Sequence, residues 1–156
     1  MTKALKKLSR RIRLELEEIE RVVRRVQAGW KEYQAFGDEL YLDSVALNLH
    51  SFYNGLERLL QGIATTVDSR LPDGESWHRA LLEQMTMEVP KVRPAVIADS
   101  TFAGLDNFRR FRHVVRNIYS YQIDPEQLKP LVDNLRETFS EVQHELLTFA
   151  DWLEQF

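Results

Sequence analysis

The chain has 156 residues and a formal net charge of −3, and 44% of its residues are hydrophobic and 29% charged. These values are ordinary for a soluble globular protein, and we therefore expect a single domain over residues 1–156. The absence of cysteine excludes a disulfide framework, a thiolate metal site and a cysteine nucleophile, and no apolar run approaches the roughly 18 residues that span a bilayer.

Apolar residues recur at helical spacing along the chain, and we find no convincing alternating strand pattern. The first helix is predicted over about residues 3–35, and Gly37 marks its end. The second helix, over about residues 39–67, is the most apolar and should be central. A turn follows, in which Asp73 is placed to cap a third helix that ends near Met87.

Two further helices are predicted after a break at Pro90 and Pro94. The fourth begins near Asp99 and Ser100 and ends around residues 119–121. The last begins at Pro125, with an aspartate before it as cap, and runs to about residue 154. Long helices with short connections predict an all-α fold, an antiparallel up-and-down bundle of about five helices.

The fourth helix carries an arginine-rich face. Four arginines lie within residues 108–121, and no acid occurs between Asp106 and Asp124. A helical wheel separates an apolar arc from a polar side, which holds Arg109, Arg112, His113, Arg116, Asn117 and Tyr119. Because arginine stays protonated, this face favours an anionic ligand. The alternative is a solvated face, or one paired with acids of a neighbouring helix such as the last.

An apolar contact surface is expected beside the arginines, because Phe102 and Leu105 point to the same side one turn earlier. A second subunit is one occupant of such a surface. The negative net charge argues against an indiscriminate nucleic-acid binder and favours selective binding of one anionic ligand. The basic segment 3–13 has three interpretations: a solvated helix start, a contact with RNA backbone, or a peripheral membrane helix. RNA agrees better than lipid with the other features.

Other polar residues are weaker candidates. One polar stripe on the second helix is best interpreted as a solvent face. If this stripe instead faced the arginine helix, it would bring Glu57 to Arg112 or Arg116 and add His50 as a titrating group. His78 and His144 stand alone, with no partner at metal-ligand spacing, so no metal and no cofactor is predicted. The chain has neither a glycine-rich phosphate loop nor a G-x-S-x-G motif, which argues against P-loop and serine hydrolases.

The pattern Arg112-x4-Asn117-x-Tyr119 resembles the R-x4-H-x-Y signature of HepT-type toxins in the HEPN superfamily. The resemblance extends over the whole chain in helix order and length. It implies an all-α bundle that forms a homodimer, acts as a metal-independent ribonuclease on RNA (tRNA by resemblance), and resides in the cytoplasm. It also implies an MNT-type nucleotidyltransferase antitoxin that silences the toxin by transferring AMP to the motif tyrosine, here Tyr119.

The chain departs from the signature at Asn117, where the family has histidine. Asparagine can hydrogen-bond a phosphate but cannot titrate, whereas the neighbouring His113 can. Our hypothesis is that His113 acts as the acid/base group and that Arg112 and Arg116 bind the scissile phosphate. Asn117 would orient this phosphate. Arg109 and Arg110 would bind further phosphate groups. The alternative is a non-catalytic HEPN module that binds a nucleotidyltransferase-like partner.

Overall fold

The computed structural model describes residues 2–116 and 123–156, and these residues form the predicted all-α bundle. The described elements are, in chain order, α1 (Lys3–Phe36), α2 (Glu39–Ile63), the π-helix η1 (Ala64–Asp68), α3 (Trp77–Met85), α4 (Asp99–Arg116) and α5 (Pro125–Leu153). No strand occurs in these residues, and no described helix is long and apolar enough to cross a membrane.

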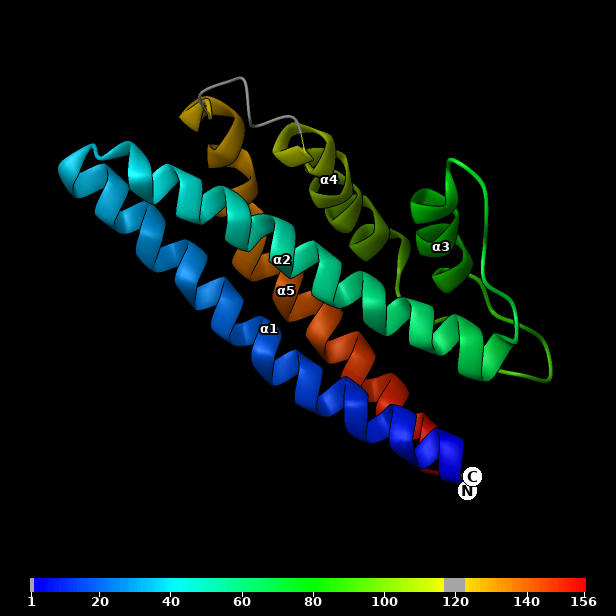
Figure 1. Ribbon diagram of the computed structural model, residues 1–156. Helices are drawn as coiled ribbons and strands as arrows, with labels where there is room; N and C mark the ends of the chain where they lie inside the picture. Colours follow the sequence, from blue (N-terminus) through cyan, green and yellow to red (C-terminus); the bar gives the residue numbers. More distant parts are fainter. Residues whose placement is uncertain (1, 117–122) are drawn as a thin grey trace.

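The first two helices, α1 and α2, form an antiparallel hairpin (Figure 1). Gly37 ends α1 in the left-handed region, with a φ of 69°, and its N–H donates to the carbonyl oxygen of Tyr33 at 2.7 Å. Asp38 begins α2, because its carboxylate accepts a hydrogen bond from the Leu40 N–H at 2.9 Å. The other long helix, α5, packs against this hairpin and brings the two chain termini to the same end of the bundle.

The centre of the core lies where α2, α4 and α5 meet. Phe52 of α2 is fully buried there, and its ring centroid lies 5.1 Å from that of Phe108 on α4 and 6.2 Å from that of Phe139 on α5. Edge-to-face aromatic contacts of this kind add to the free energy gained by burial. The most apolar helix is therefore central, as predicted, and it seats α4 through aromatic side chains.

The third helix begins later than predicted. It starts at Trp77, with Ser76 as the preceding residue, so the prediction that Asp73 caps it is wrong. Gly74 explains the difference, because its φ of 89° lies outside the helical region and keeps the chain in a turn. The predicted second helix does continue past residue 63, but residues 64–68 have π-helical hydrogen bonding.

The connection between α3 and α4 is anchored by a buried ion pair. Arg93 donates from Nε to Asp68 Oδ1 at 2.6 Å and from Nη2 to Asp68 Oδ2 at 2.8 Å. The same guanidinium donates to the carbonyl oxygens of Gln84, Met87 and Pro94. This bidentate pair joins the end of η1 to the segment that leads into α4, and so helps to position α4 beside α3.

The described part of α4 ends at Arg116, and the predicted end around residues 119–121 lies outside the described residues. The predicted apolar surface of Phe102 and Leu105 is wrong in part. Leu105 is fully buried in the core. Phe102 is half-buried, and the guanidinium of Arg79 lies over its ring, with Cζ 5.7 Å from the ring centroid.

Candidate functional site

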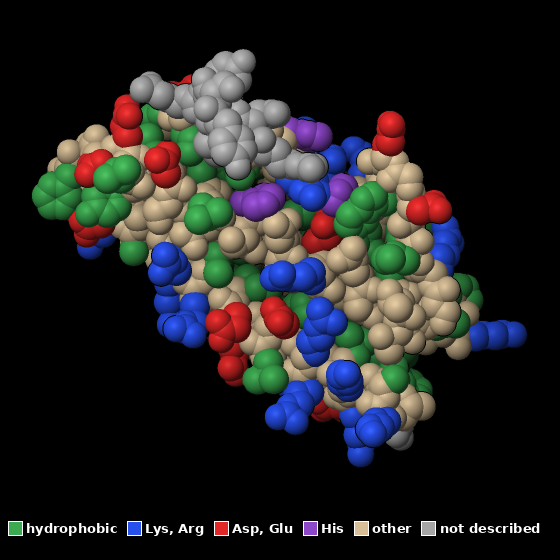
Figure 2. Space-filling model, in the orientation of Figure 1, with side chains coloured by type: hydrophobic (Ala, Val, Ile, Leu, Met, Phe, Trp, Pro, Cys, Tyr) green, Lys and Arg blue, Asp and Glu red, His purple; other side chains and the backbone are tan. Residues whose placement is uncertain are grey.

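A basic pocket of about 390 Å³ lies between α3 and α4. Its lining consists of Glu75, Ser76, His78, Arg79, Arg109, Arg112 and His113. Three of the predicted site residues, Arg109, Arg112 and His113, therefore face one cavity. On the face of the molecule where α4 lies beside α2 and α3, histidine side chains gather next to Lys or Arg side chains (Figure 2). A pocket with this lining suits an anionic ligand.

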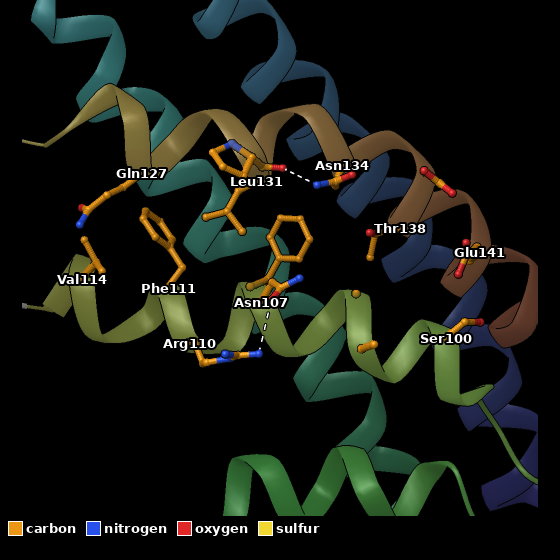
Figure 3. Close-up of a pocket in the computed structure, with 15 residues that line it drawn as sticks. Ser100, Asn107, Arg110, Phe111, Val114, Gln127, Leu131, Asn134, Thr138 and Glu141 are labelled. Atoms are coloured by element: carbon orange, nitrogen blue, oxygen red, sulfur yellow. Dashed lines mark hydrogen bonds between the residues drawn. The ribbon is translucent and has the colours of Figure 1, made fainter.

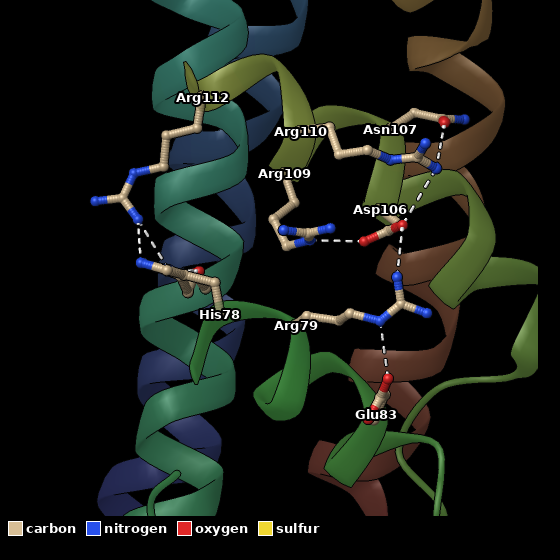
Figure 4. A network of polar contacts seen from close by, with 9 residues as sticks. His78, Arg79, Glu83, Asp106, Asn107, Arg109, Arg110 and Arg112 are labelled. Carbon is tan, nitrogen blue, oxygen red and sulfur yellow. Dashed lines mark hydrogen bonds and ion pairs between the residues drawn. The ribbon is translucent and has the colours of Figure 1, made fainter. Parts of the chain in front are cut away.

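Part of the arginine face is neutralised by a buried acid on α4 itself. Asp106 accepts from Arg109 Nε at 2.6 Å and lies 3.2 Å from Arg110 Nη2 and 3.9 Å from Arg79 Nη1 (Figure 4). Arg109 and Arg110 therefore pair with an acid of α4 itself, and not with acids of the last helix, which was the alternative expected from the sequence. Asp106 fixes their positions and reduces the positive charge on that side of the pocket.

Arg112 has a different partner. Its Nη1 lies 2.9 Å from His78 Nδ1 and also contacts His78 Nε2. The same Nδ1 also lies 2.7 Å from Glu57 Oε2. The result is a chain of three side chains from three helices, Glu57 of α2, His78 of α3 and Arg112 of α4. Figure 4 shows the Arg112 guanidinium directed at the His78 ring.

The inner part of this chain is shielded from water. Only 8% of the Glu57 side chain and 19% of the His78 side chain are exposed. The Trp77 ring lies against the imidazole, with centroids 3.6 Å apart. Burial, and then the nearby carboxylate of Glu57, raise the pKa of Tyr53, so this buried hydroxyl stays protonated. The Nε of Arg112 is buried and has no hydrogen-bond partner among the described residues.

Two sequence-based interpretations are wrong here. The polar stripe of α2 was interpreted as a solvent face, but Glu57 is buried and His50 is half-buried, hydrogen-bonded to Asn54 at 2.9 Å. Glu57 reaches Arg112 through His78 rather than directly. His78 was interpreted as standing alone, yet it is the residue that links the two. No spacing rule within one helix finds such a contact, because its members come from separate helices.

The remaining predicted site residues lie elsewhere or outside the described part. Arg110 hydrogen-bonds Asn107 at 3.4 Å and lines a different pocket, of about 770 Å³, between α4 and α5 (Figure 3). For Arg116 the structure describes the helical backbone only, and Asn117 and Tyr119 lie outside the described residues. Within residues 2–116 and 123–156, no group of three or more His, Asp or Glu side chains is arranged to hold a metal ion.

The basic N-terminal segment is partly paired with α5. Arg13 donates from Nη2 to Asp151 at 2.5 Å and to Glu154 at 3.1 Å. Ser9 donates to the same Glu154 carboxylate at 2.6 Å. These contacts, Ser9 first and then Arg13, hold the pKa of Glu154 below its ordinary value. Polar contacts therefore hold the first part of α1 against the C-terminal end of α5.

Comparison with protein families gives one match, to the family described as HepT-like protein, over residues 44–153. The matched region begins within α2 and includes α3, α4 and all of α5, and with them every residue of the basic pocket. No curated protein and no solved structure matched the chain.

Proposed function

The chain belongs to the HepT-like family of the HEPN superfamily, and on this premise we propose that it is a toxin that cleaves RNA without a metal ion. The observation that carries the proposal is the position of Arg112. Its guanidinium lies in the basic pocket, and its buried Nε lacks an acceptor among the described residues. A phosphate oxygen is the acceptor that such an arginine binds best, since guanidinium and phosphate form paired hydrogen bonds.

The pocket supplies the groups that metal-free RNA cleavage needs. The 2′-hydroxyl must lose its proton, the charge on the five-coordinate phosphorus must be stabilised, and the leaving 5′-oxygen must gain a proton. Arg112 and Arg109 line the pocket and provide fixed positive charge for the phosphate. His113 is exposed at the same pocket, and an imidazole can both accept and donate a proton. We assign it the proton transfer, with Arg116 and Asn117 assisting in phosphate binding and orientation.

The test is cleavage of total tRNA by the purified protein in excess EDTA. We expect cleavage by the wild-type protein, and losses of about 10²–10⁴-fold in Arg112→Ala and His113→Ala, the range for removing an electrostatic or acid–base group. Arg24→Ala is the matched control because Arg24 is an exposed arginine of α1. Full activity of His113→Ala would remove its assigned role, and intact tRNA with the wild-type protein would remove the enzyme proposal.

One feature favours a second candidate function. Asn117 occupies the histidine position of the family signature, so the chain lacks the titrating group that this position supplies. A non-catalytic module would still bind a nucleotidyltransferase-like partner. Expression in cells separates the two: growth arrest that Arg112→Ala abolishes supports the toxin, and harmless expression together with stable complex formation supports the binding module.

Regulation by AMP transfer follows the family pattern. We propose that an MNT-type nucleotidyltransferase antitoxin modifies the hydroxyl of Tyr119. Mass spectrometry of the chain co-expressed with such a nucleotidyltransferase should show an added mass of one or more AMP units. Tyr119→Phe should abolish the adduct, whereas Tyr121→Phe is the nearby control. An unmodified wild-type chain would contradict the proposal for that pair.

The assembly state is also a proposal. The buried residues of α1 to α5 form one continuous core, which supports a single domain over residues 1–156. We propose that two copies associate through the surface of α4, and that the reaction takes place in the cytoplasm. The groove between α4 and α5 supports this association, since Phe111 and Val114 of α4 line it opposite Leu131 (Figure 3). Light scattering should give a dimer mass, which Val114→Glu should reduce to that of the monomer.

A further inference from the structure

We propose that His78 is a positioning residue for Arg112: as a neutral imidazole oriented by Glu57, it accepts a hydrogen bond from Arg112 and holds this guanidinium at the basic pocket without neutralising it. The positional claim rests on the contacts among these three side chains. Its consequence for RNA cleavage rests on the proposed function.

One protonation state of the imidazole satisfies both Glu57 and Arg112. Arginine has five N–H donors and no acceptor, so one of the two ring nitrogens that Arg112 contacts must carry a lone pair. The Glu57 carboxylate is an acceptor, so the nitrogen that it contacts, Nδ1 at 2.7 Å, must carry the proton. Nε2 is then the acceptor for Arg112 Nη1. The neutral imidazole with Nδ1–H donates to Glu57 and keeps Nε2 as an acceptor for Arg112, whereas the Nε2–H form could accept from Arg112 at Nδ1 but would offer no proton to Glu57.

The surroundings hold the ring in this orientation. The carboxylate and the imidazole are both largely buried, and the Trp77 ring lies against His78 at a centroid distance of 3.6 Å. Burial strengthens the hydrogen bond between Glu57 and His78, because water does not compete for it. The acceptor at Nε2 therefore has a fixed place relative to α4, which is what a positioning group requires.

A neutral acceptor suits an arginine that must bind an anion. Arg109 and Arg110 are held by the carboxylate of Asp106, which cancels part of their charge. Arg112 is held by an uncharged ring instead, and its positive charge remains available to a phosphate. The pocket thus contains two kinds of arginine, one kind paired with an acid and one held by a neutral group.

Protonation of His78 would end this arrangement, because Nε2 would become a donor facing another donor. The charged and titratable groups around the ring come from three parts of the fold. They are Glu57 of α2, which contacts the ring, and Glu75, Arg79, Arg109, Arg112 and His113 of α3 and α4 and the turn before α3, which line the same pocket. Loss of the acceptor at Nε2 therefore releases Arg112 from its position and lowers the rate of cleavage.

The experiment compares His78→Gln with His78→Ala in the full chain. A glutamine side-chain oxygen can take the place of Nε2 as an uncharged acceptor that does not titrate. We expect His78→Gln to keep kcat/KM within about threefold of wild type, and His78→Ala to lose about 10²-fold, the effect of a misplaced binding group.

Two results would overturn the proposal. If His78→Gln loses as much activity as His78→Ala, proton transfer by His78 rather than positioning is the role. If His78→Ala keeps wild-type activity, His78 has no role in the reaction. His144→Gln, on the exposed face of α5, is the matched control for replacing a histidine.

A second measurement does not depend on activity or on the folding of a variant. Nitrogen-15 NMR of the wild-type protein at pH 8 should show the His78 ring with a protonated Nδ1 and an unprotonated Nε2. An Nε2–H tautomer at this pH would overturn the proposal. If the wild-type protein does not cleave RNA, the proposed function fails, and the NMR result still decides the position of Arg112.

Discussion

His78 on α3 and Arg112 on α4 are separated by 34 positions in the sequence, and Arg112 Nη1 contacts both ring nitrogens of His78. The contact joins the short helix α3 to the helix that carries the family signature. Glu57 of α2 completes it through a contact with His78 Nδ1 at 2.7 Å. The basic pocket is therefore a product of three helices, and changes on α2 or α3 should alter what α4 can bind.

The first prediction concerns Asp106, which neutralises arginines at the pocket. In Asp106→Asn the pocket loses one negative charge, so RNA should bind more tightly at low salt. The plot of log K against log salt concentration should become steeper by about 0.7 for each further phosphate contact that an arginine makes. The free energy of unfolding should fall by about 1–3 kcal/mol, because the arginines lose a charged acceptor.

Binding titrations at several salt concentrations and urea denaturation measure both effects. Asp43→Asn, an exposed acid on α2, controls for the loss of one charge. An unchanged salt dependence in Asp106→Asn would mean that Arg109 and Arg79 do not contact the RNA backbone.

The second prediction concerns the buried ion pair that anchors the segment before α4. Asp68→Ala leaves the fully buried Arg93 guanidinium without its carboxylate. Breaking a buried pair from one side costs about 3–5 kcal/mol of unfolding free energy. The exposed pair of Lys129 and Asp133 is the matched control, since Asp133→Ala should cost no more than about 0.5 kcal/mol. Equal effects of the two variants in urea denaturation would contradict the structural role of Asp68.

The third prediction is a pH dependence at the end of the bundle that joins α1 to α5. The hydrogen bonds from Ser9 and Arg13 lower the pKa of Glu154 in the folded state. A lowered pKa contributes stability above the unfolded-state value, and this contribution is lost as the pH falls through the folded-state value. The stability advantage of wild type over Glu154→Gln should therefore be present at neutral pH and decline from about pH 4.5 downward.

Thermal unfolding of both proteins from pH 7 to pH 3 measures this difference. Glu17→Gln, which removes an exposed glutamate from α1, controls for the general effect of losing one acid. A stability difference for Glu154→Gln that stays constant over this pH range would refute the assignment.

The fourth prediction concerns the aromatic contacts that seat α4. Phe52 is fully buried between Phe108 and Phe139, so Phe52→Ala should lower the free energy of unfolding by about 3–5 kcal/mol. Phe36 is 73% exposed at the end of α1, and Phe36→Ala should change the same quantity by about 0.5 kcal/mol or less. Denaturant titration of the two variants tests whether the core is centred where α2, α4 and α5 meet.

The helices of this chain were predictable from the sequence because each one is governed by local chemistry. Gly37, Asp38 and Asp124 mark helix ends through backbone conformation and side-chain caps, and the structure has these ends where they were expected. The start of α3 was not predicted correctly, since Gly74 takes a positive φ that composition alone does not reveal. The switch of residues 64–68 to π-helical hydrogen bonding likewise had no signal in the sequence.

The site was predictable only in part. The arginine-rich face pointed to Arg109, Arg112 and His113, and all three line one pocket. Arg110 faces the other flank of α4. His78 was missed, because a single histidine on a short helix has no partner within its own element.

The sequence by itself determined the helical bundle, the family and the arginine-rich helix, since helical periodicity, capping and the R-x4-N-x-Y pattern are properties of neighbouring residues along the chain. Only the tertiary structure decided which arginines are paired with an acid and which one is held by a neutral ring. Asp106 lies close to Arg109 and Arg110 because they are three and four positions away on one helix. Glu57, His78 and Arg112 meet because the packing of α2, α3 and α4 brings together side chains that are remote in the sequence.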